Sequence, residues 1–465
     1  MTKTARIAGG QGFYGDTPRG LARLLDAKPD YLCLEALAEL TLAILAKDRA
    51  RDETRGYTAD LPFYLGAAMP SVVERGMRII TNAGGVNPIA AGRVALAAAR
   101  TGEHRGIKIA TIVGDEILGK LDAWTADGED FAHIDTGETL AARLARANHG
   151  RDTSSTIQPI LANAYLGAEP IVEALNNDAQ IVLTGRVADA SLFLAAAMHR
   201  FGWAADDWDR LASGVTIGHL LECSGQVAGG NYSGPWWKPE TPWELPFPFA
   251  DVAADGSAVL GKAPNTGGQM TFDTVRHQLL YEVGDPARYM SPDVIANFTS
   301  PQFTNREADH VAMTPATGSA RPDTLKAVIA IPSGFSCEAN VVFAWPDARE
   351  KAQATAAIVT ERARMAGLPV EEWRVEIYGA GAIGPEALAP DPPEVVLRVA
   401  WKCADALTAG LVARELPALA LSGPAPGLAT VGRGISKPTQ LLEVFPTTVD
   451  RGRVESGVAI DIVEA

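Results

Sequence analysis

The feature that most constrains the fold is an alternation of short apolar runs with longer helical patterns through the first 200 residues. Each apolar run has the length of a buried strand, and several are followed by apolar residues at helical spacing. The strands are expected at residues 5–8, 30–34, 77–81, 107–113 and 179–184. Repeated strand–helix units form largely parallel sheets with helices on both faces. The sequence therefore predicts an α/β amino-terminal domain with a mostly parallel, doubly wound sheet.

The pattern changes from about residue 324. Two strand–helix–strand units follow, which predicts a mainly antiparallel sheet with helices on one face, an α+β arrangement of the ferredoxin-like type. A chain of 465 residues also exceeds what one hydrophobic core usually holds. We expect two domains, over residues 1–323 and 324–465. The sheet of the second domain is a candidate subunit contact, so a homo-oligomer is expected.

The charge balance excludes several classes of protein. The chain has 56 acidic and 41 basic residues and a net charge of −15 at pH 7. Without a cluster of Lys and Arg to neutralise a run of phosphates, nucleic acid is not an expected partner. No apolar run approaches the roughly 20 residues that span a bilayer, and the amino terminus lacks the apolar core of a signal peptide. We expect a cytoplasmic protein without a membrane partner.

Cysteine and histidine spacing predicts neither a disulfide framework nor a metal site. The four cysteines lie far apart without a C-x-x-C pair, and no two of the seven histidines are four residues apart. Carboxylates that bind a divalent metal together with the substrate remain an alternative, so the metal content stays open. No nicotinamide or flavin is expected, because no G-x-G-x-x-G motif follows a strand.

Polar residues cluster directly after the expected strands. In open α/β sheets the ligand crevice lies beyond the carboxyl ends of the strands, so these side chains are expected to face one site. They are Gln11, Asp16, Glu35, Asn82, Asn87, Asp115, Glu116, Thr184, Arg186 and Asp189. Their number predicts a polar ligand.

The stretch NAGGVNP, residues 82–88, lies between a strand and a helix. Gly84 and Gly85 allow a tight turn, Asn87 can cap the helix, and Pro88 suits its first position. Free amides at such a helix start can bind a carboxylate or a phosphate. The alternative is an ordinary strand-to-helix turn, which α/β proteins contain whatever their function.

Arg186 is the one guanidinium in the polar set. It can hold a carboxylate through two parallel hydrogen bonds, which is a common arrangement in anion sites. The alternative is a structural ion pair with Asp189 or Asp115.

A second polar segment, HLLECSGQVAGGNYSG, spans residues 219–234. It contains Glu222, Cys223, Gln226 and Asn231 in a glycine-rich loop after a helical start. Glu222 is a candidate general acid or base, because a carboxyl group withdrawn from water has a raised pKa. Cys223 is either the alternative catalytic residue or a buried, inert thiol.

Five strings in the chain are QGFYGD, TNAGGVNP, TGRVADASLF, ECSGQVAGGN and YEVGDPARYMSPDV. Together they resemble the acyclic terpene utilisation AtuA family over nearly the whole chain. The family name comes from a catabolic gene cluster for branched terpene acids handled as CoA thioesters, which implies acyl or carboxylate chemistry. The resemblance implies a site made of the motif residues Gln11, Asp16, Asn82, Asn87, Arg186, Asp189, Glu222, Gln226 and Asn231.

Two hypotheses about function follow. The first is an enzyme that acts on a small-molecule carboxylate or an acyl-CoA as a hydratase, dehydratase or carbon–carbon lyase. In it, Arg186 and the amides of residues 82–87 hold the carboxylate or thioester oxygen, while Glu222 or Asp189 moves the proton. The second is a non-catalytic metabolite-binding subunit or scaffold. A Glu222→Gln variant separates them, since it should abolish turnover and spare binding only in the enzyme.

Overall fold

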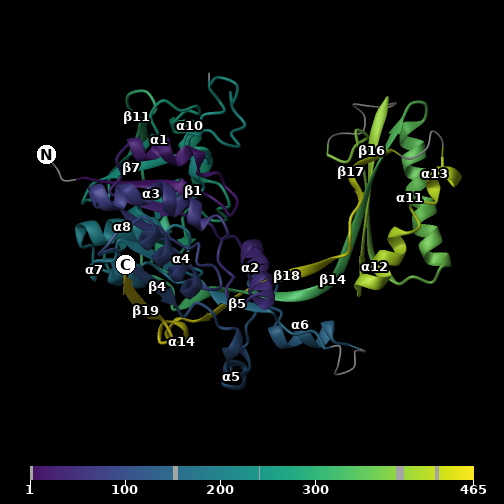
Figure 1. Cartoon of the computed structure of the whole chain (residues 1–465), viewed down its shortest axis with the longest axis horizontal. Helices are drawn as coiled ribbons and strands as arrows, with labels where there is room; N and C mark the ends of the chain where they lie inside the picture. The colour runs from purple at the N-terminus through teal and green to yellow at the C-terminus, as the bar shows by residue number, and fades with distance from the viewer. Residues whose placement is uncertain (1–3, 150–155, 240, 384–391, 425–428) are drawn as a thin grey trace. The chain divides into compact units, whose positions relative to one another are not determined.

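The computed structural model describes residues 4–149, 156–239, 241–383, 392–424 and 429–465. The chain forms two compact units, Met1–Ile329 with Val444–Ala465, and Ala330–Glu443 (Figure 1). The sequence predicts that every residue from 324 onward belongs to the second domain, but the carboxyl-terminal segment returns to the first unit. The reason is that β19 (Ala459–Glu464) pairs antiparallel with β4 (Lys108–Val113). No helix among the described residues is long and apolar enough to cross a bilayer.

The main sheet of the first unit has a parallel centre and antiparallel edges. Its order is β11-β12-β8-β7-β1-β2-β3-β6-β4-β19. The parallel strands are β1 (Ala5–Gln11), β2 (Tyr31–Leu34), β3 (Arg78–Thr81), β6 (Ile181–Thr184) and β4. The antiparallel strands beside β1 are β7 (Pro248–Val252), β8 (Ala258–Lys262), β12 (Val311–Met313) and β11 (Phe303–Asn305). All five expected strands are present, but the sheet is mixed rather than mostly parallel.

Helices cover both faces of this sheet. One face buries apolar side chains of α1 (Leu21–Asp26), α3 (Leu61–Arg75) and α4 (Pro88–Thr101) against the strands. The helices α7 (Glu169–Asn176), α8 (Ser191–Phe201) and α9 (Trp208–Glu222) contact the central strands and one another. Because the central strands are buried on both faces, they are continuously apolar, which is the signal read from the sequence.

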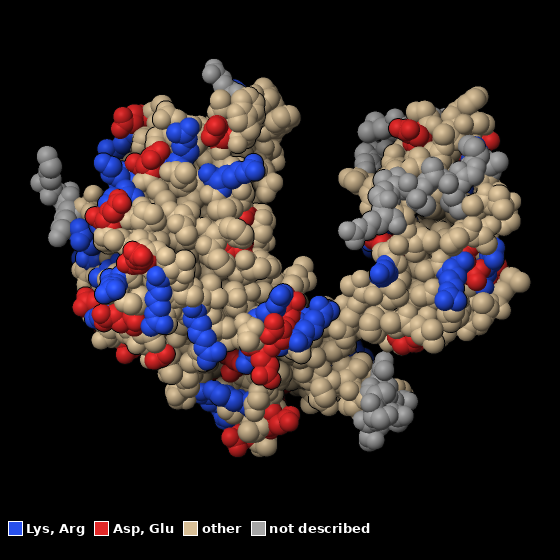
Figure 2. Space-filling model, in the orientation of Figure 1, with Lys and Arg blue, Asp and Glu red and all other residues tan. Residues whose placement is uncertain are grey.

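The rest of the first unit supplies short elements around the sheet. The helices are α2 (Glu39–Arg51), α5 (Leu121–Ala126), α6 (Leu140–Ala147), α10 (Phe272–Leu279) and α14 (Arg451–Glu455). A small antiparallel sheet contains β9 (Tyr289–Met290), β10 (Ile295–Asn297) and β13 (Thr317–Ser319). On the face shown in Figure 2, basic side chains lie beside acidic ones, so the described residues there carry mixed charge.

The second unit is an antiparallel sheet with helices packed on one face. Its sheet order is β15-β16-β14-β17. The elements, in chain order, are β14 (Thr324–Ala344), α11 (Ala348–Met365), β15 (Val370–Tyr378), β16 (Glu394–Cys403), α12 (Ala406–Ala413), α13 (Leu419–Ser422), β17 (Ala429–Ile435) and β18 (Thr439–Asp450). Residues 324–329 of β14 and 444–450 of β18 belong to the first unit. Alternate residues of β14 and β16, such as Phe343 and Trp401, are buried against α11 and α12. This period-2 burial explains the alternating sequence pattern.

Two glycines of the first unit let the end of β1 lie directly against the end of α9. A Cβ on Gly9 would stand 2.5 Å from the carbonyl oxygen of Leu221, and one on Gly12 would stand 2.9 Å from the carbonyl carbon of Cys223. Larger residues would push the two elements apart. The glycines therefore bring the polar segment that follows α9 beside the carboxyl ends of the central strands.

Gly9→Ala should destabilise the protein, whereas Gly66→Ala should stabilise it. The added methyl at Gly9 meets backbone, which cannot rotate away, so we expect a loss of about 1–3 kcal/mol in the free energy of unfolding. Gly66 lies inside α3 with open space around its Cα. Alanine there should add about 0.5–1 kcal/mol through helix propensity. Urea denaturation measures both, and equal shifts would contradict the close approach of β1 and α9.

Candidate functional site

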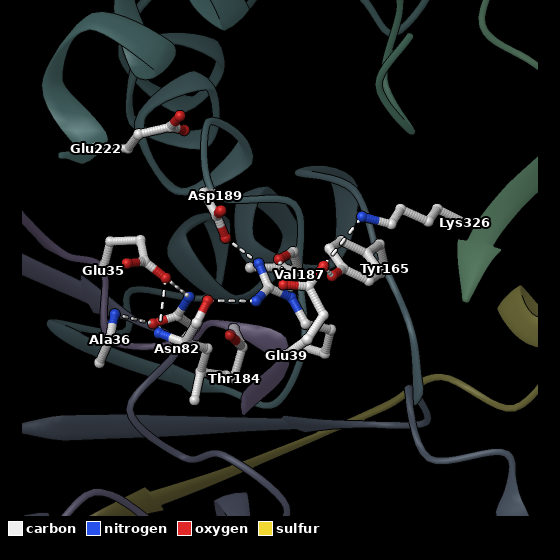
Figure 3. Close-up of polar contacts among 12 residues, drawn as sticks. Glu35, Ala36, Glu39, Asn82, Tyr165, Thr184, Val187, Asp189, Glu222 and Lys326 are labelled. Carbon is white, nitrogen blue, oxygen red and sulfur yellow. Dashed lines mark hydrogen bonds and ion pairs between the residues drawn. The ribbon is translucent and has the colours of Figure 1, made fainter. Parts of the chain in front are cut away.

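Glu35 and Asn82 form a buried pair at the carboxyl ends of β2 and β3. The Asn82 amide nitrogen donates to Glu35 Oε1 at 3.0 Å, and the backbone nitrogen of Leu37 donates to the same oxygen at 2.7 Å. Asn82 Oδ1 in turn accepts from the backbone nitrogen of Ala36 at 2.8 Å (Figure 3). The two side chains meet because parallel strands end at the same edge of the sheet.

The protonation of Glu35 is set by its burial. Burial raises the pKa of Glu35 to about 7, although the positive charge of Arg186 and the hydrogen bonds from Asn82 and Leu37 lower it; the negative charge of Glu222 raises it further. A carboxyl group with such a pKa exchanges its proton near neutral pH, as a general acid or base must. The sequence places Glu35 after a strand but gives it no role.

Arg186 is buried and its guanidinium is bonded within the protein. Nε donates to the carbonyl oxygen of Val187 at 2.8 Å and Nη1 to that of Leu37 at 2.5 Å, while Nη2 forms an ion pair with Asp189. The ring of Tyr165 lies under the guanidinium, with its centre 4.3 Å from Cζ. The structural ion pair with Asp189 is therefore present, and the side chain ties together the loops after β2 and β6.

Asp115 accepts a hydrogen bond from the loop after β6, which contains Arg186. Its Oδ2 accepts the backbone N–H of Arg186 at 2.8 Å and the amide of Asn163 at 2.7 Å. Burial raises the pKa of Asp115 to about 6, even though these hydrogen bonds lower it. Asp115 contacts the backbone of Arg186 rather than its guanidinium, so its role is to position the turn.

Glu222 and His219 share a proton at the end of α9. His219 Nε2 lies 3.1 Å from the carbonyl oxygen of Gln278, which can only accept, so Nε2 carries a hydrogen. His219 Nδ1 lies 2.9 Å from Glu222 Oε1. That bond needs one proton, either on Nδ1 of an imidazolium or on a neutral Glu222. The second oxygen, Oε2, is buried without a hydrogen-bond partner in the described structure.

Cys223 is held as a thiol. Its burial and the negative charge of neighbouring Glu222 raise its pKa to about 12, against a hydrogen bond with Gln278 that lowers it. A thiol must ionise to act as a nucleophile. The surroundings therefore favour the inert thiol of the two alternatives left open by the sequence.

The NAGGVNP motif serves as a strand-to-helix turn. Asn87 Oδ1 accepts from Ala90 at the start of α4, and its amide nitrogen donates to the carbonyl oxygens of Glu53 at 2.9 Å and Arg55 at 2.7 Å. The backbone N–H groups of Gly85 and Asn87 bond to carbonyl oxygens within the turn. A Cβ on Gly84 would collide with the carbonyl oxygen of Thr184. The polar groups expected to bind an anion are thus largely bonded inside the protein.

A surface groove of about 660 Å³ lies beside this turn. Its polar lining consists of two arginines, two carboxyl groups and one amide, from Arg49, Arg93, Glu53, Glu116 and Asn87, and apolar side chains from α4 and its neighbours complete it. Arg49 donates to the carbonyl oxygen of Val86 and to Glu116. The groove opens at the same edge of the sheet as the buried carboxyl groups.

Gln11 and Asp16 order the turn after β1. Gln11 donates to Asp60 at 3.0 Å, and Asp16 accepts the backbone N–H groups of Gly12 at 3.1 Å and Thr17 at 2.7 Å. Burial raises the pKa of Asp16, although its backbone hydrogen bonds lower it. In the other loop, the Asn231 amide donates to Gln226 Oε1 at 2.9 Å.

Three residues near Arg186 carry no signal in the sequence. Tyr165 donates from its hydroxyl to Glu39 Oε1 at 2.5 Å, and Lys326 Nζ donates to the same oxygen at 3.0 Å. Burial would raise the pKa of Glu39, but these two hydrogen bonds and the charge of Lys326 lower it to about 2. Lys326 lies in β14, far from Glu39 in the chain, so their contact depends on long-range packing that the sequence does not indicate. Among the described residues, no three His, Cys, Asp or Glu side chains gather as a metal site.

Fold and site together define a mixed α/β protein with buried carboxyl groups at the carboxyl edge of the parallel strands. The chain belongs to the acyclic terpene utilisation AtuA family, whose model matches residues 5–460. This match confirms the resemblance seen in the sequence motifs, and membership suggests a role in acyclic terpene catabolism. Neither a search of curated proteins nor a search of solved structures gave a match.

Glu35→Gln should change the pH dependence of stability. The pKa of Glu35 is about 7 in the folded protein and about 4.3 in an unfolded chain. Its contribution to stability is therefore complete below about pH 4 and lost as the pH rises through 7. The stability of Glu35→Gln relative to the wild type should rise across that window by roughly 4 kcal/mol.

Glu39→Gln is the matched control, because its stability relative to the wild type should change with pH in the opposite direction. Because the folded pKa of Glu39 is lowered to about 2, its contribution is present above the unfolded value and lost as the pH falls toward 2. The deficit of the variant should therefore shrink at acid pH. Urea denaturation over a pH series measures both, and parallel curves for wild type and Glu35→Gln would refute a buried, titrating Glu35.

Proposed function

We propose that the protein is an enzyme of acyclic terpene catabolism that moves a proton on a carboxylated or CoA-linked small molecule. The reaction class is hydration, dehydration or carbon–carbon cleavage. The observation that supports it best is the presence of two buried carboxyl groups, Glu35 and Glu222, with different hydrogen-bond partners at one edge of the sheet. Figure 3 shows them with Asp189 around one region of the site.

The two carboxyl groups suit complementary roles. Glu35 is fixed by N–H donors and titrates near neutrality, while Glu222 shares a proton with His219. Groups whose surroundings give them different protonation states can act as acid and base in one reaction. The negative charge of Glu222 also raises the pKa of Glu35, so the two carboxyl groups are electrostatically linked.

Arg186 and Asn82 are positioning residues in this proposal. Arg186 holds the carbonyl oxygens of Leu37 and Val187 and the carboxylate of Asp189, which leaves its buried fork little capacity for a ligand. Asn82 orients Glu35. Where the ligand carries an anionic extension, Arg93 in the surface groove offers a guanidinium group to bind it, whereas Arg49 is already paired with Glu116.

Replacing either carboxyl group should remove turnover. Purified protein is first screened by thermal shift against di- and tricarboxylates, CoA and branched acyl-CoA thioesters, and conversion of any stabilising compound is then followed by mass spectrometry. Glu222→Gln and Glu35→Gln should lower kcat by about 10²–10⁴-fold, the usual contribution of a general acid or base. Binding should persist.

The control is Glu372→Gln, which removes an exposed carboxyl group of the second unit. It should leave both turnover and binding unchanged. A compound that binds the wild type without conversion, and binds Glu222→Gln equally well, would favour a metabolite-binding subunit over an enzyme.

A further inference from the structure

The last residue of α9 and the segment directly after it have an excess of unpaired polar groups. Glu222 Oε2, Ser224 Oγ and Gln226 Nε2 are each buried without a hydrogen-bond partner in the described structure. Native proteins pair nearly all buried polar atoms, so each exception calls for an explanation. Three exceptions within five residues indicate that a group outside the chain completes their hydrogen bonds.

Two more such atoms lie on α10, which packs against α9. Gln278 Oε1 and His277 Nδ1 belong to α10 and are also buried without partners. Gln278 is attached to α9 at two points. Its side-chain amide nitrogen donates to the backbone carbonyl oxygen of His219, and its backbone carbonyl oxygen accepts from His219 Nε2. The unpaired atoms thus belong to one structural neighbourhood.

The chemistry of the unpaired atoms defines what they can bind. Gln226 Nε2 is a donor, and the Ser224 hydroxyl can donate. With the shared proton on His219, Glu222 Oε2 is a carboxylate oxygen free to accept. Two donors and one acceptor within residues 222–226 match a carbonyl or carboxylate oxygen next to a carbon that carries an acidic proton.

The sequence predicts that Arg186 and the amides of residues 82–87 bind the substrate oxygen, but most of these groups already have hydrogen-bond partners within the protein. The guanidinium of Arg186 is bonded to Leu37, Val187 and Asp189. The amides of the turn before α4 are bonded largely within the turn. A different set of donors is therefore needed for the substrate oxygen.

We propose that Ser224 and Gln226 hydrogen-bond the acyl or carboxylate oxygen of the substrate, with Glu222 beside the adjacent carbon. The inference rests on the proposed function and names the oxygen-binding groups of the same site. When the carbon–hydrogen bond breaks, its electron pair becomes the carbon–carbon double bond of an enolate. Negative charge then moves onto the substrate oxygen, where the two donors stabilise it. The proton passes to Glu222 Oε2.

The test separates oxygen binding from proton transfer. The probes are 3-methylbutanoate, its CoA thioester and 3-methylbutan-1-amine, a cation of similar shape whose polar group cannot accept a hydrogen bond. Calorimetry gives Kd for each, and mass spectrometry in D₂O follows exchange of the protons next to the thioester carbonyl. The wild type should bind an acyl probe, exchange those protons and not bind the amine.

The variants are Ser224→Gly, Gln226→Met and Glu222→Gln. Glycine suits position 224 because Ser224 has a φ of 49°, in the left-handed region. Ser224→Gly and Gln226→Met should each raise Kd about tenfold, as expected for one lost hydrogen bond. Glu222→Gln should keep its affinity and lose exchange. Gln302→Met, at an exposed glutamine outside the site, is the matched control and should bind as the wild type does.

Each outcome bears on a different claim. Wild-type affinity in both Ser224→Gly and Gln226→Met, with far-ultraviolet circular dichroism showing folded protein, overturns the oxygen-binding role and leaves proton transfer intact. Weakened binding in both variants, without exchange in the wild type, supports the oxygen-binding role and counts against the proposed function. A wild type that binds none of the acyl probes overturns the oxygen-binding role outright.

Discussion

The buried guanidinium of Arg186 is the interaction around which the site is arranged. Burying a cation costs free energy unless hydrogen-bond acceptors or an anion replace the water that it loses. Here the carbonyl oxygens of Leu37 and Val187, the carboxylate of Asp189 and the ring of Tyr165 meet that demand. These partners come from three separate segments, so one charge fixes the loops after β2 and β6 and the segment after β5 (Leu161–Ala164).

That arrangement changes how the polar residues after the strands are interpreted. A strand end rich in polar side chains indicates a site, but it does not separate residues that build the site from those that face the ligand. Asn87 and Asp115 are engaged in holding turns, whereas Glu222 keeps an unpaired oxygen. Sequence alone cannot make this distinction, because it depends on which partners the fold brings within hydrogen-bond distance.

The same limit applies to the fold. The central strands and their helices are predictable, since burial on both faces produces uninterrupted apolar runs such as residues 179–184. The strands β8, β11 and β12 are short and partly exposed, and their pairing is antiparallel, so they leave no comparable pattern. The return of β19 to β4 joins residues far apart in the chain, and Lys326 reaches Glu39 in the same long-range way. The local hydrophobic periodicity of the sequence does not predict contacts between residues so far apart in the chain.

The pairing of β19 with β4 has a consequence for the order of assembly. The second unit is inserted in the chain between two parts of the first. During synthesis on the ribosome, β4 therefore emerges long before β19, the strand that pairs with it. Until residues 459–464 emerge, β4 presents a row of unpaired backbone groups at a sheet edge, the kind of edge at which chains aggregate. The nascent chain therefore depends on residues 459–464 to cover the edge of a sheet whose other strands are synthesised much earlier.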